Sequence, residues 1–364
     1  MGRLGKLLVG VVIVGGVALV ALFAFRGPLA VSMMERVVTA NMAADPIAML
    51  DDGLHVGLCG AGAPLPDPER GGPCTVVVAK MGEQSRVFVV DSGAAGVRTL
   101  AQMQLPPGAI DAVLLTHFHS DHIDGLGELA MQRWVNRQAM SPLPVHGPVG
   151  VARVVSGFNE AYAQDFVYRT QHHGADIVPP GGAGMVPVAF VEPDVGDAAV
   201  LFDDNGLKVI AFKVDHTPVS PAVGYRFDFA GRSLVISGDT VKSDNLIAFA
   251  QGVDLLLHEA LAPQLVDVLT RAARAAGRAN IEKITIDILD YHTTPVEAAQ
   301  SAQEAGAAML VFHHVVPALP IAPLQSVFLE GVSDAYDGPV ALGVDGDFWS
   351  LPSQSTDIRH SSRL

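Results

Sequence analysis

Basic residues are scarce in this chain of 364 residues. It has 23 Lys and Arg against 38 Asp and Glu, a formal net charge of −15. Proteins that bind nucleic acid through its phosphates usually carry a basic patch or stripe, whereas the Lys and Arg residues here are scattered singly. A local patch within the acidic total is compatible with these counts, but the composition predicts that nucleic acid is not a partner.

Cysteine is also scarce, with only Cys59 and Cys74, both in the stretch GLCGAGAPLPDPERGGPCT. In a reducing compartment such residues are small buried side chains, whereas in an oxidising compartment they can close a short disulfide loop. Whether the geometry permits a bond depends on the fold. We predict the disulfide, because the N-terminal segment predicts that the body of the protein is exported.

Charge is absent from residues 7–25, an apolar run long enough to cross the roughly 30 Å hydrocarbon core of a membrane as a helix. Arg3 and Lys6 precede the run and Arg26 alone follows it, which by the positive-inside tendency places the N-terminus in the cytoplasm. We predict a single-pass protein of the inner or plasma membrane with an extracytoplasmic, periplasmic catalytic domain. A cleaved signal peptide is the alternative, although the run is longer than its usual apolar region.

Strands and helices follow without a linker or a repeat. Runs such as TVVVAK and LKVIAFKVDH are typical of buried strands, while GELAMQRWVNRQ has helical spacing. YRFDF and RSLVI, separated by AG, predict a hairpin, so the sheet content is mixed and the fold class is α+β. We divide the chain into a cytoplasmic tip and transmembrane anchor (1–30), a connecting helix (31–50), one catalytic domain (51–352) and a loose polar tail (353–364).

The segment THFHSDH follows the apolar run DAVLL. Residues two apart at a strand end point the same way, so His117 and His119 can face one ion. The following turn carries Asp121 and His122 toward a neighbouring position. Imidazole and carboxylate ligands suit Zn²⁺, with iron and manganese as alternatives. A polar surface turn rich in histidine is the competing interpretation, but we predict a metal site.

Further candidate ligands follow three later apolar strands. They are His216 in FKVDHTP, Asp239 in LVISGDT, and the pair His313 and His314 in LVFHHVVP. Taken singly, each is compatible with a buried side chain that is merely hydrogen-bonded. Their recurrence after apolar strands predicts that they complete the metal site.

In this order, THFHSDH, VDH, SGDT, LLLHEA and FHHVVP resemble the motifs of the metallo-β-lactamase superfamily, whose members fold as a four-layer αββα sandwich. GAPLPDPERGGPC, HEA and YHTTPVEAA are most similar to its ribonuclease Z branch, which includes arylsulfatase-like members. The resemblance spans about residues 57–351 and implies two divalent metal ions, with zinc as the expected metal. It implies His117, His119 and His216 for the first ion, Asp121, His122 and His314 for the second, and Asp239 as the bridge, with His313 pointing away.

The resemblance also implies a hydrolytic mechanism, in which two ions hold a bridging hydroxide near neutral pH and Asp121 helps to orient it. His292 in YHTTP, paired with Glu259 in LLLHEA, would donate a proton or a hydrogen bond to the leaving oxygen. Thr293 and Thr294 would contact a phosphate or sulfate of the substrate. The segment TTPVEAA is also a good helix start, so an N-cap-like role for His292 is an alternative compatible with the first.

The remaining polar residues of note are interpreted as structural. By the same resemblance, Asp91 would be a buried residue near the metal loop, and His258 a hydrogen-bond partner outside the ligand set. His146 is interpreted as a packing residue, and His172 and His173 as part of a polar loop.

We therefore expect a metal-dependent hydrolase of a small-molecule sulfate ester, phosphodiester or related ester. A ribonuclease Z-like endonuclease for tRNA 3′ processing is the alternative. Two features argue against this alternative. The first is the predicted export. The second is residues 174–204, where the resemblance implies a basic RNA-binding arm but the sequence has no Lys or Arg. Lactone or carboxylic ester hydrolysis on the same site, and a non-catalytic scaffold, are further alternatives; the complete ligand set argues against the scaffold. A homodimer is compatible with the sequence.

Overall fold

The computed structural model describes residues 2, 23, 25–65, 67, 70–137 and 139–364. The chain divides into two units, Met1–Met49 and Leu50–Leu364. In the first unit, residues 25–43 form a helix with exposed side chains. Among the residues that the structure describes, none of the helices has the length and apolar character needed to cross a membrane. The predicted anchor, residues 7–25, falls almost wholly outside the described residues.

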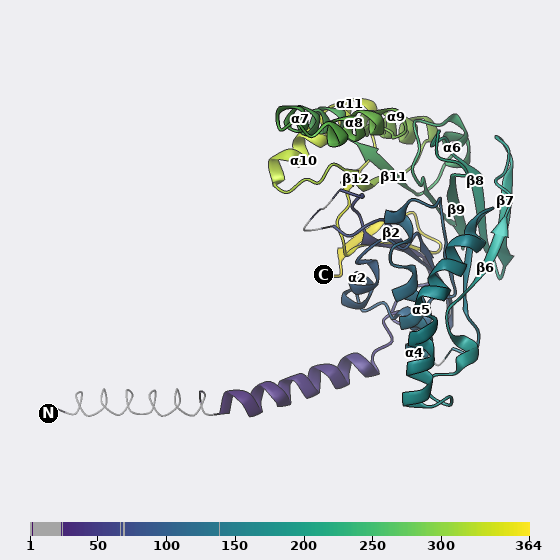
Figure 1. Cartoon of the computed structure of the whole chain (residues 1–364). Coiled ribbons are helices and arrows are strands. Elements are labelled where there is room, and N and C mark those ends of the chain that lie inside the picture. The colour runs from purple at the N-terminus through teal and green to yellow at the C-terminus, as the bar shows by residue number, and fades with distance from the viewer. Residues whose placement is uncertain (1, 3–22, 24, 66, 68–69, 138) are drawn as a thin grey trace. The chain divides into compact units, whose positions relative to one another are not determined.

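The second unit is built on two β-sheets that face each other, with helices on the outer sides (Figure 1). The first sheet has eight strands. Their order is β15 (Arg359–Ser362), β14 (Asp347–Pro352), β1 (Gly53–Gly60), β2 (Cys74–Met81), β3 (Gln84–Val90), β4 (Ala112–Leu114), β5 (Leu143–Pro148) and β6 (Met185–Phe190). Pairing is antiparallel from β15 to β3 and parallel from β3 to β6.

The second sheet has seven strands. Their order is β13 (Val340–Leu342), β12 (Leu310–Val316), β11 (Leu255–Leu261), β10 (Arg232–Ile236), β9 (Val223–Phe229), β8 (Leu207–Lys213) and β7 (Ala198–Asp204). Pairing is parallel from β13 to β10 and antiparallel from β10 to β7. The mixed sheets confirm the predicted α+β class.

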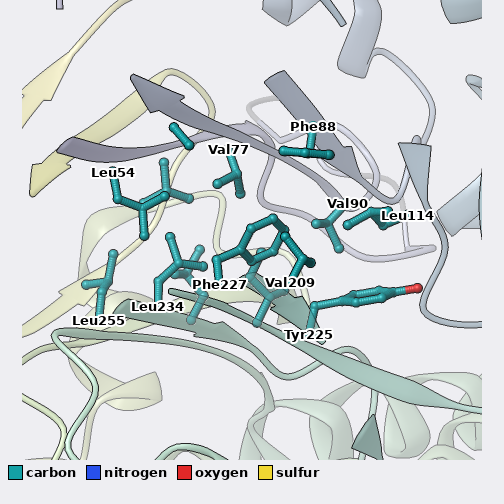
Figure 2. Packing of buried hydrophobic residues seen from close by; sticks show 14 of the residues in the cluster. Leu54, Val77, Phe88, Val90, Leu114, Val209, Tyr225, Phe227, Leu234 and Leu255 are labelled. Carbon is teal, nitrogen blue, oxygen red and sulfur yellow. The ribbon is translucent and has the colours of Figure 1, made fainter. Parts of the chain in front are cut away.

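The main core lies between the two sheets. Leu54, Val77 and Phe88 from the first sheet belong to one buried cluster with Val209 and Phe227 from the second, and Figure 2 shows these side chains facing each other. Strands near the centre are buried on both faces because helices cover their outer sides. This double burial explains why strands such as β2 are continuous apolar runs rather than alternating ones.

Helices cover the outer faces of both sheets (Figure 1). On the side of the first sheet lie α2 (Gly96–Gln102), α4 (Leu126–Arg137) and α5 (Val151–His173). Six of the described helices lie on the side of the second sheet: α6 (Asp244–Phe249), α7 (Pro263–Ala275), α8 (Ala279–Asp287), α9 (Pro295–Ala305), α10 (Ala322–Phe328) and α11 (Val332–Ala335). A second apolar cluster packs α6, α9, α10 and α11 on the second sheet.

The structure confirms two local predictions, a hairpin and a disulfide, and contradicts a third, the loose tail. The predicted hairpin is confirmed: β9 and β10 are joined by Ala230 and Gly231, with φ of 52° and 77°, as a two-residue loop with both φ positive requires. The predicted disulfide between Cys59 and Cys74 is present, with a Cα–Cα distance of 4.9 Å. The tail was expected to be loose, but it contributes β15, which pairs with β14.

Candidate metal centre

The carboxyl ends of strands from both sheets bring the predicted ligands together. His117 follows β4 of the first sheet, while His216 and Asp239 follow β8 and β10 of the second. His314 lies within β12. The centre therefore straddles the two sheets, and its geometry depends on how the sheets face each other.

The ligand loop after β4 is fixed by the loop after β3. His119 is extended, with φ −62° and ψ 149°, and directly precedes α3 (Ser120–Ile123), which carries Asp121 and His122. The backbone N–H of Ser92 donates to the carbonyl of His122 at 2.8 Å. A Cβ atom at Gly93 would lie 2.3 Å from the carbonyl oxygen of Asp121. Only glycine therefore allows this close approach of the two loops.

Two groups of donor atoms form at this edge of the sandwich. The first comprises His117, His119, His216 and Asp239, and the second Asp121, His122 and His314. The donor atoms of each group all lie within 4.8 Å of one another. A third, overlapping group joins His292 to Asp239 and His314.

Asp239 lies between the two main groups. Its Oδ2 is 3.8 Å from Nε2 of both His117 and His216. The same oxygen is 3.4 Å from Nε2 of both His122 and His314. A carboxylate that is shared in this way suits a bridge between two neighbouring cations.

Several of these donor atoms are buried without a hydrogen-bond partner in the part of the chain that the structure describes. They are Oδ2 of Asp121, Oδ1 of Asp239, and Nε2 of His122, His216 and His314. A buried polar atom without a partner costs about 1–3 kcal/mol, and divalent cations would satisfy all five. The residues therefore fit a dinuclear metal site. Their imidazole and carboxylate atoms suit zinc, and iron or manganese accept the same donors.

Charge pairing within the centre opposes the effect of burial. Burial lowers the pKa of His314, but the nearby carboxylates of Asp239 and Asp121 outweigh it and raise that pKa to about 9. Burial likewise favours neutral His122, yet Asp239 and Asp91 raise its pKa well above the usual value. Without cations, protons on these imidazoles balance the carboxylates. A bound cation would displace them, so metal uptake should release protons.

Strand β12 carries a bulge at the ligand position. The register pairs Glu259 with His313 and Ala260 with Val315, so it skips His314. The φ of His314 is +47°, a region uncommon for residues other than glycine. Bulges re-aim side chains, and this one aims His314 at the donor groups. His313 belongs to none of the groups, and burial lowers its pKa to about 3.

Further hydrogen bonds orient the ligand rings. Asp91 accepts from the Thr116 hydroxyl and from Nδ1 of His122, each at 2.8 Å. The same hydroxyl is 3.1 Å from Nδ1 of His117. These contacts occupy the Nδ1 atoms and leave Nε2 of both rings for a cation, the arrangement usual around metal-binding histidines.

His292 and Glu259 form a buried pair beside the donor groups. Nδ1 of His292 is 3.0 Å from Oε1 of Glu259. The backbone N–H groups of Thr293 and Thr240 donate to the same oxygen, at 3.1 and 3.2 Å. The ring of His292 stacks on that of His314, with 5.6 Å between centroids. With Nδ1 held by Glu259, Nε2 of His292 is the nitrogen available to a substrate.

Thr293 and Thr294 use their hydroxyls within the protein. The hydroxyl of Thr293 donates to the carbonyl of Thr240. Thr294 is the N-cap of α9 and forms a capping box: its hydroxyl accepts from the Glu297 N–H at 3.2 Å, and the Glu297 carboxylate accepts from the Thr294 N–H at 3.0 Å. Their contact to a substrate stays a prediction, and it would require these bonds to open.

The other singled-out histidines lie away from the donor groups. His146 is buried in β5 with its ring 4.9 Å from that of Phe202, and burial lowers its pKa to about 4. Nδ1 of His258 hydrogen-bonds the backbone of the next residue at 2.8 Å. His172 and His173 were expected in a polar loop, but they are exposed residues of the last turn of α5.

Two residues that the sequence analysis did not single out support the site. Thr240 contacts Glu259 through its N–H and Thr293 through its carbonyl. The carbonyl of Tyr291 accepts a hydrogen bond from Nδ1 of His216 at 2.9 Å. Both adjoin residues of recognised motifs, SGDT and YHTTP, and this adjacency was the available signal.

The sandwich and its donor groups are those of a metallo-β-lactamase-type hydrolase. The chain matches the model of the metallo-beta-lactamase superfamily over residues 68–285, and it belongs to that superfamily. Within it, the chain is 37% identical over 268 residues to ribonuclease Z of Mycobacterium bovis, covering 73% of this chain and 87% of that protein. It is 34% identical over 294 residues to ribonuclease Z of Mycobacterium marinum, covering 80% and 96%. The solved structure of human tRNase Z, short form, superposes with a TM-score of 0.53 at 26% identity, covering 82% of this chain and 99% of that one.

These relatives overturn the predicted partner. They are named as ribonucleases, and the human structure as a tRNase, so the expectation of a small-molecule ester substrate without nucleic acid is wrong. The same similarity counts against the predicted periplasmic, membrane-bound location. The acidic total misled because net charge sums over the whole surface, whereas a substrate meets only the surroundings of the site.

Proposed function

We propose that this protein is a metal-dependent endonuclease of the ribonuclease Z type, which hydrolyses a phosphodiester bond in RNA, with precursor tRNA as substrate. The main support for this proposal is the buried His292–Glu259 pair beside the two groups of donor atoms, in which Nδ1 of His292 is 3.0 Å from Oε1 of Glu259. The identity of 37% to a ribonuclease Z supports the choice of substrate.

The proposed ligand assignment follows the two donor groups. His117, His119 and His216 would hold one cation, Asp121, His122 and His314 the other, and Asp239 both. When bound, such a cation pair supplies a water nucleophile at neutral pH and positive charge for the phosphoryl oxygens. Asp121, the carboxylate of the second donor group, would also help to orient the attacking water.

His292 would act on the leaving oxygen. Glu259 accepts the hydrogen bond from Nδ1 of His292 and so keeps Nε2 turned to the substrate. For this step the ring carries hydrogen on both nitrogens, and Glu259 stabilises its positive charge. As the bond from phosphorus to the leaving oxygen breaks, Nε2 gives its proton to that oxygen, and the neutral ring keeps hydrogen on Nδ1. Glu259 itself is fully buried and anchored by two backbone N–H groups, so it positions His292 and does not touch the substrate.

The test is cleavage of RNA by the full chain. A precursor tRNA transcript labelled on its 3′ extension would be incubated with zinc-loaded or manganese-loaded protein, with and without a chelator. We expect a single endonucleolytic cut that the chelator abolishes and that metal restores. Asp239→Ala should be inactive, whereas Asp124→Ala, an exposed acid of the same loop region outside the donor groups, should retain activity. An intact transcript despite two bound metal ions would overturn the proposal.

A further inference from the structure

His313 lies beside Glu259 on the neighbouring strand. The register of β11 and β12 pairs Leu257 with Val311 and Glu259 with His313. Directly paired residues of parallel strands project to the same face, because alternation has a period of two. Leu257 and Val311 both belong to the core between the sheets, so Glu259 and His313 face that inner side as well.

Both side chains are buried, and each has polar atoms without a hydrogen-bond partner among the described residues. Glu259 is fully buried and His313 is 4% exposed. Oε1 of Glu259 accepts three hydrogen bonds, from His292, Thr293 and Thr240. Oε2 has no partner among the described residues, and neither has Nδ1 or Nε2 of His313. An acceptor and a donor that both lack partners thus occupy paired positions on adjacent strands, and burial without a partner is costly for each.

Neither group belongs to the metal ligands. His314, not His313, contributes to the donor groups, because the bulge at His314 turns only that ring toward Asp121 and Asp239. No direct hydrogen bond joins the two side chains in the described part of the chain. Adjacent strands are about 4.8 Å apart, a separation that one bridging water can span between paired side chains. The link would add a fourth hydrogen bond to the carboxylate that holds His292.

We propose that His313 is a positioning residue, whose ring donates a hydrogen bond through one buried water to Oε2 of Glu259. The chain His313–Glu259–His292 then fixes the carboxylate from both oxygens. A carboxylate held at one oxygen can rotate, whereas one held at both keeps the neutral ring of His292 in the tautomer with hydrogen on Nδ1, the form left after Nε2 has given up its proton. This role rests on the proposed function for its catalytic consequence, but the hydrogen-bond chain does not depend on the substrate.

Paired variants test the proposal. His313→Leu removes the donor with little change in volume, and His313→Gln keeps a donor. On the RNA substrate we expect about a tenfold lower kcat for His313→Leu with KM and bound metal unchanged, and recovery of most of this loss in His313→Gln. In a His292→Ala background, His313→Leu should have no further effect. An equal loss in that background, or loss of a metal ion from His313→Leu, would overturn the proposal.

A second readout separates this inference from the proposed function. Histidine ¹⁵N chemical shifts of the metal-loaded protein report the tautomer of His292, which is assigned by its disappearance in His292→Ala. For the neutral ring of His292, we expect a single Nδ1–H tautomer in the wild type and in His313→Gln, and a mixture in His313→Leu. If His313→Leu does not fold, His313→Thr takes its place with the same expectation. Unchanged shifts would overturn the role of His313, while an uncut RNA with the expected shifts would overturn only the proposed function.

Discussion

The two halves of the metal centre are built in different ways. His117, His119, Asp121 and His122 lie within one short loop and the helix α3 that follows it. His216 and Asp239 follow two strands of the second sheet and His314 lies within a third, with many residues between them. The first set takes its geometry from local backbone, whereas the second takes it from sheet register and from one bulge. The difference teaches that a contiguous motif can be read from sequence, but a dispersed one becomes a site only through the fold.

The largest expected effect is at the residue that joins the two halves. Asp239→Ala removes the carboxylate that lies within 3.8 Å of nitrogen atoms from four histidines. We expect loss of at least one metal ion, measured by elemental analysis, and at least a 10³-fold loss of RNA cleavage, because the two cations would lose the anionic ligand that they share. His119→Ala, at the half-exposed rim of the local set, should lose less. Equal losses in both variants would contradict the central place of Asp239.

Replacing His292 should affect chemistry without affecting metal binding. His292→Ala removes the proposed proton donor, and loss of a general acid commonly lowers kcat by about 10²–10⁴-fold. We expect a drop of about 10²-fold in kcat with two metal ions retained. His172→Ala, an exposed histidine at the end of α5, is the control and should behave as wild type. Loss of metal from His292→Ala would instead make this residue a ligand.

The disulfide lies beside the loop that carries Asp121, and we expect it to contribute to the free energy of unfolding. The bridge closes a loop between residues 15 apart in sequence, and a Cβ at Gly72 in that loop would lie 2.9 Å from the carbonyl oxygen of Asp121. Replacing Cys59 and Cys74 by Ser should lower the free energy of unfolding by about 3 kcal/mol. Denaturant unfolding of the wild type with and without a reductant is the matched control. A double variant as stable as the oxidised wild type would contradict this contribution.

His146, in the first sheet and outside the centre, should make stability depend on pH. Its pKa is about 4 in the folded protein, against 6.5 for the unconstrained side chain. The unfolded chain therefore binds more protons than the folded protein below pH 6.5. The stability that neutral His146 contributes to the fold is complete above that pH and is lost as pH falls toward 4. His146→Leu should remove on the order of 2 kcal/mol of this acid sensitivity. The free energy of unfolding of His146→Leu minus that of the wild type should therefore rise as pH falls from 7 to 4, and a constant difference across this range would contradict the prediction.

The smallest effect is expected at Thr294, where two roles compete. As the N-cap of α9 with a capping box, it should cost about 1 kcal/mol of stability when replaced by Ala. If capping is its role, kcat and KM for RNA stay unchanged. A rise in KM well beyond the stability effect would favour the predicted substrate contact instead.

The candidate site residues could largely be identified from the sequence, whereas the structure around them could be predicted less well. The structure places the histidines and the aspartate of THFHSDH after β4, at the predicted strand end, and strand and loop could be predicted because they are local features. Their role as ligands stays a prediction. Residues alone could not choose between His313 and His314, since the choice depends on a bulge defined by pairing with β11. Nor could they show that the polar tail pairs with β14, because an edge strand gains its stability from its neighbour. The inferred export and the charge total led to the wrong partner because neither describes the surface around the donor groups.

Asp91 gives the two halves a common support. This one buried carboxylate holds His122 of the second donor group directly and His117 of the first through the Thr116 hydroxyl. Ordering either ring therefore steadies the carboxylate for the other, so part of the entropic cost of the second binding event is met by the first. Metal uptake should consequently be cooperative: a titration of metal-free protein would pass from empty to dinuclear molecules with few singly loaded ones in between.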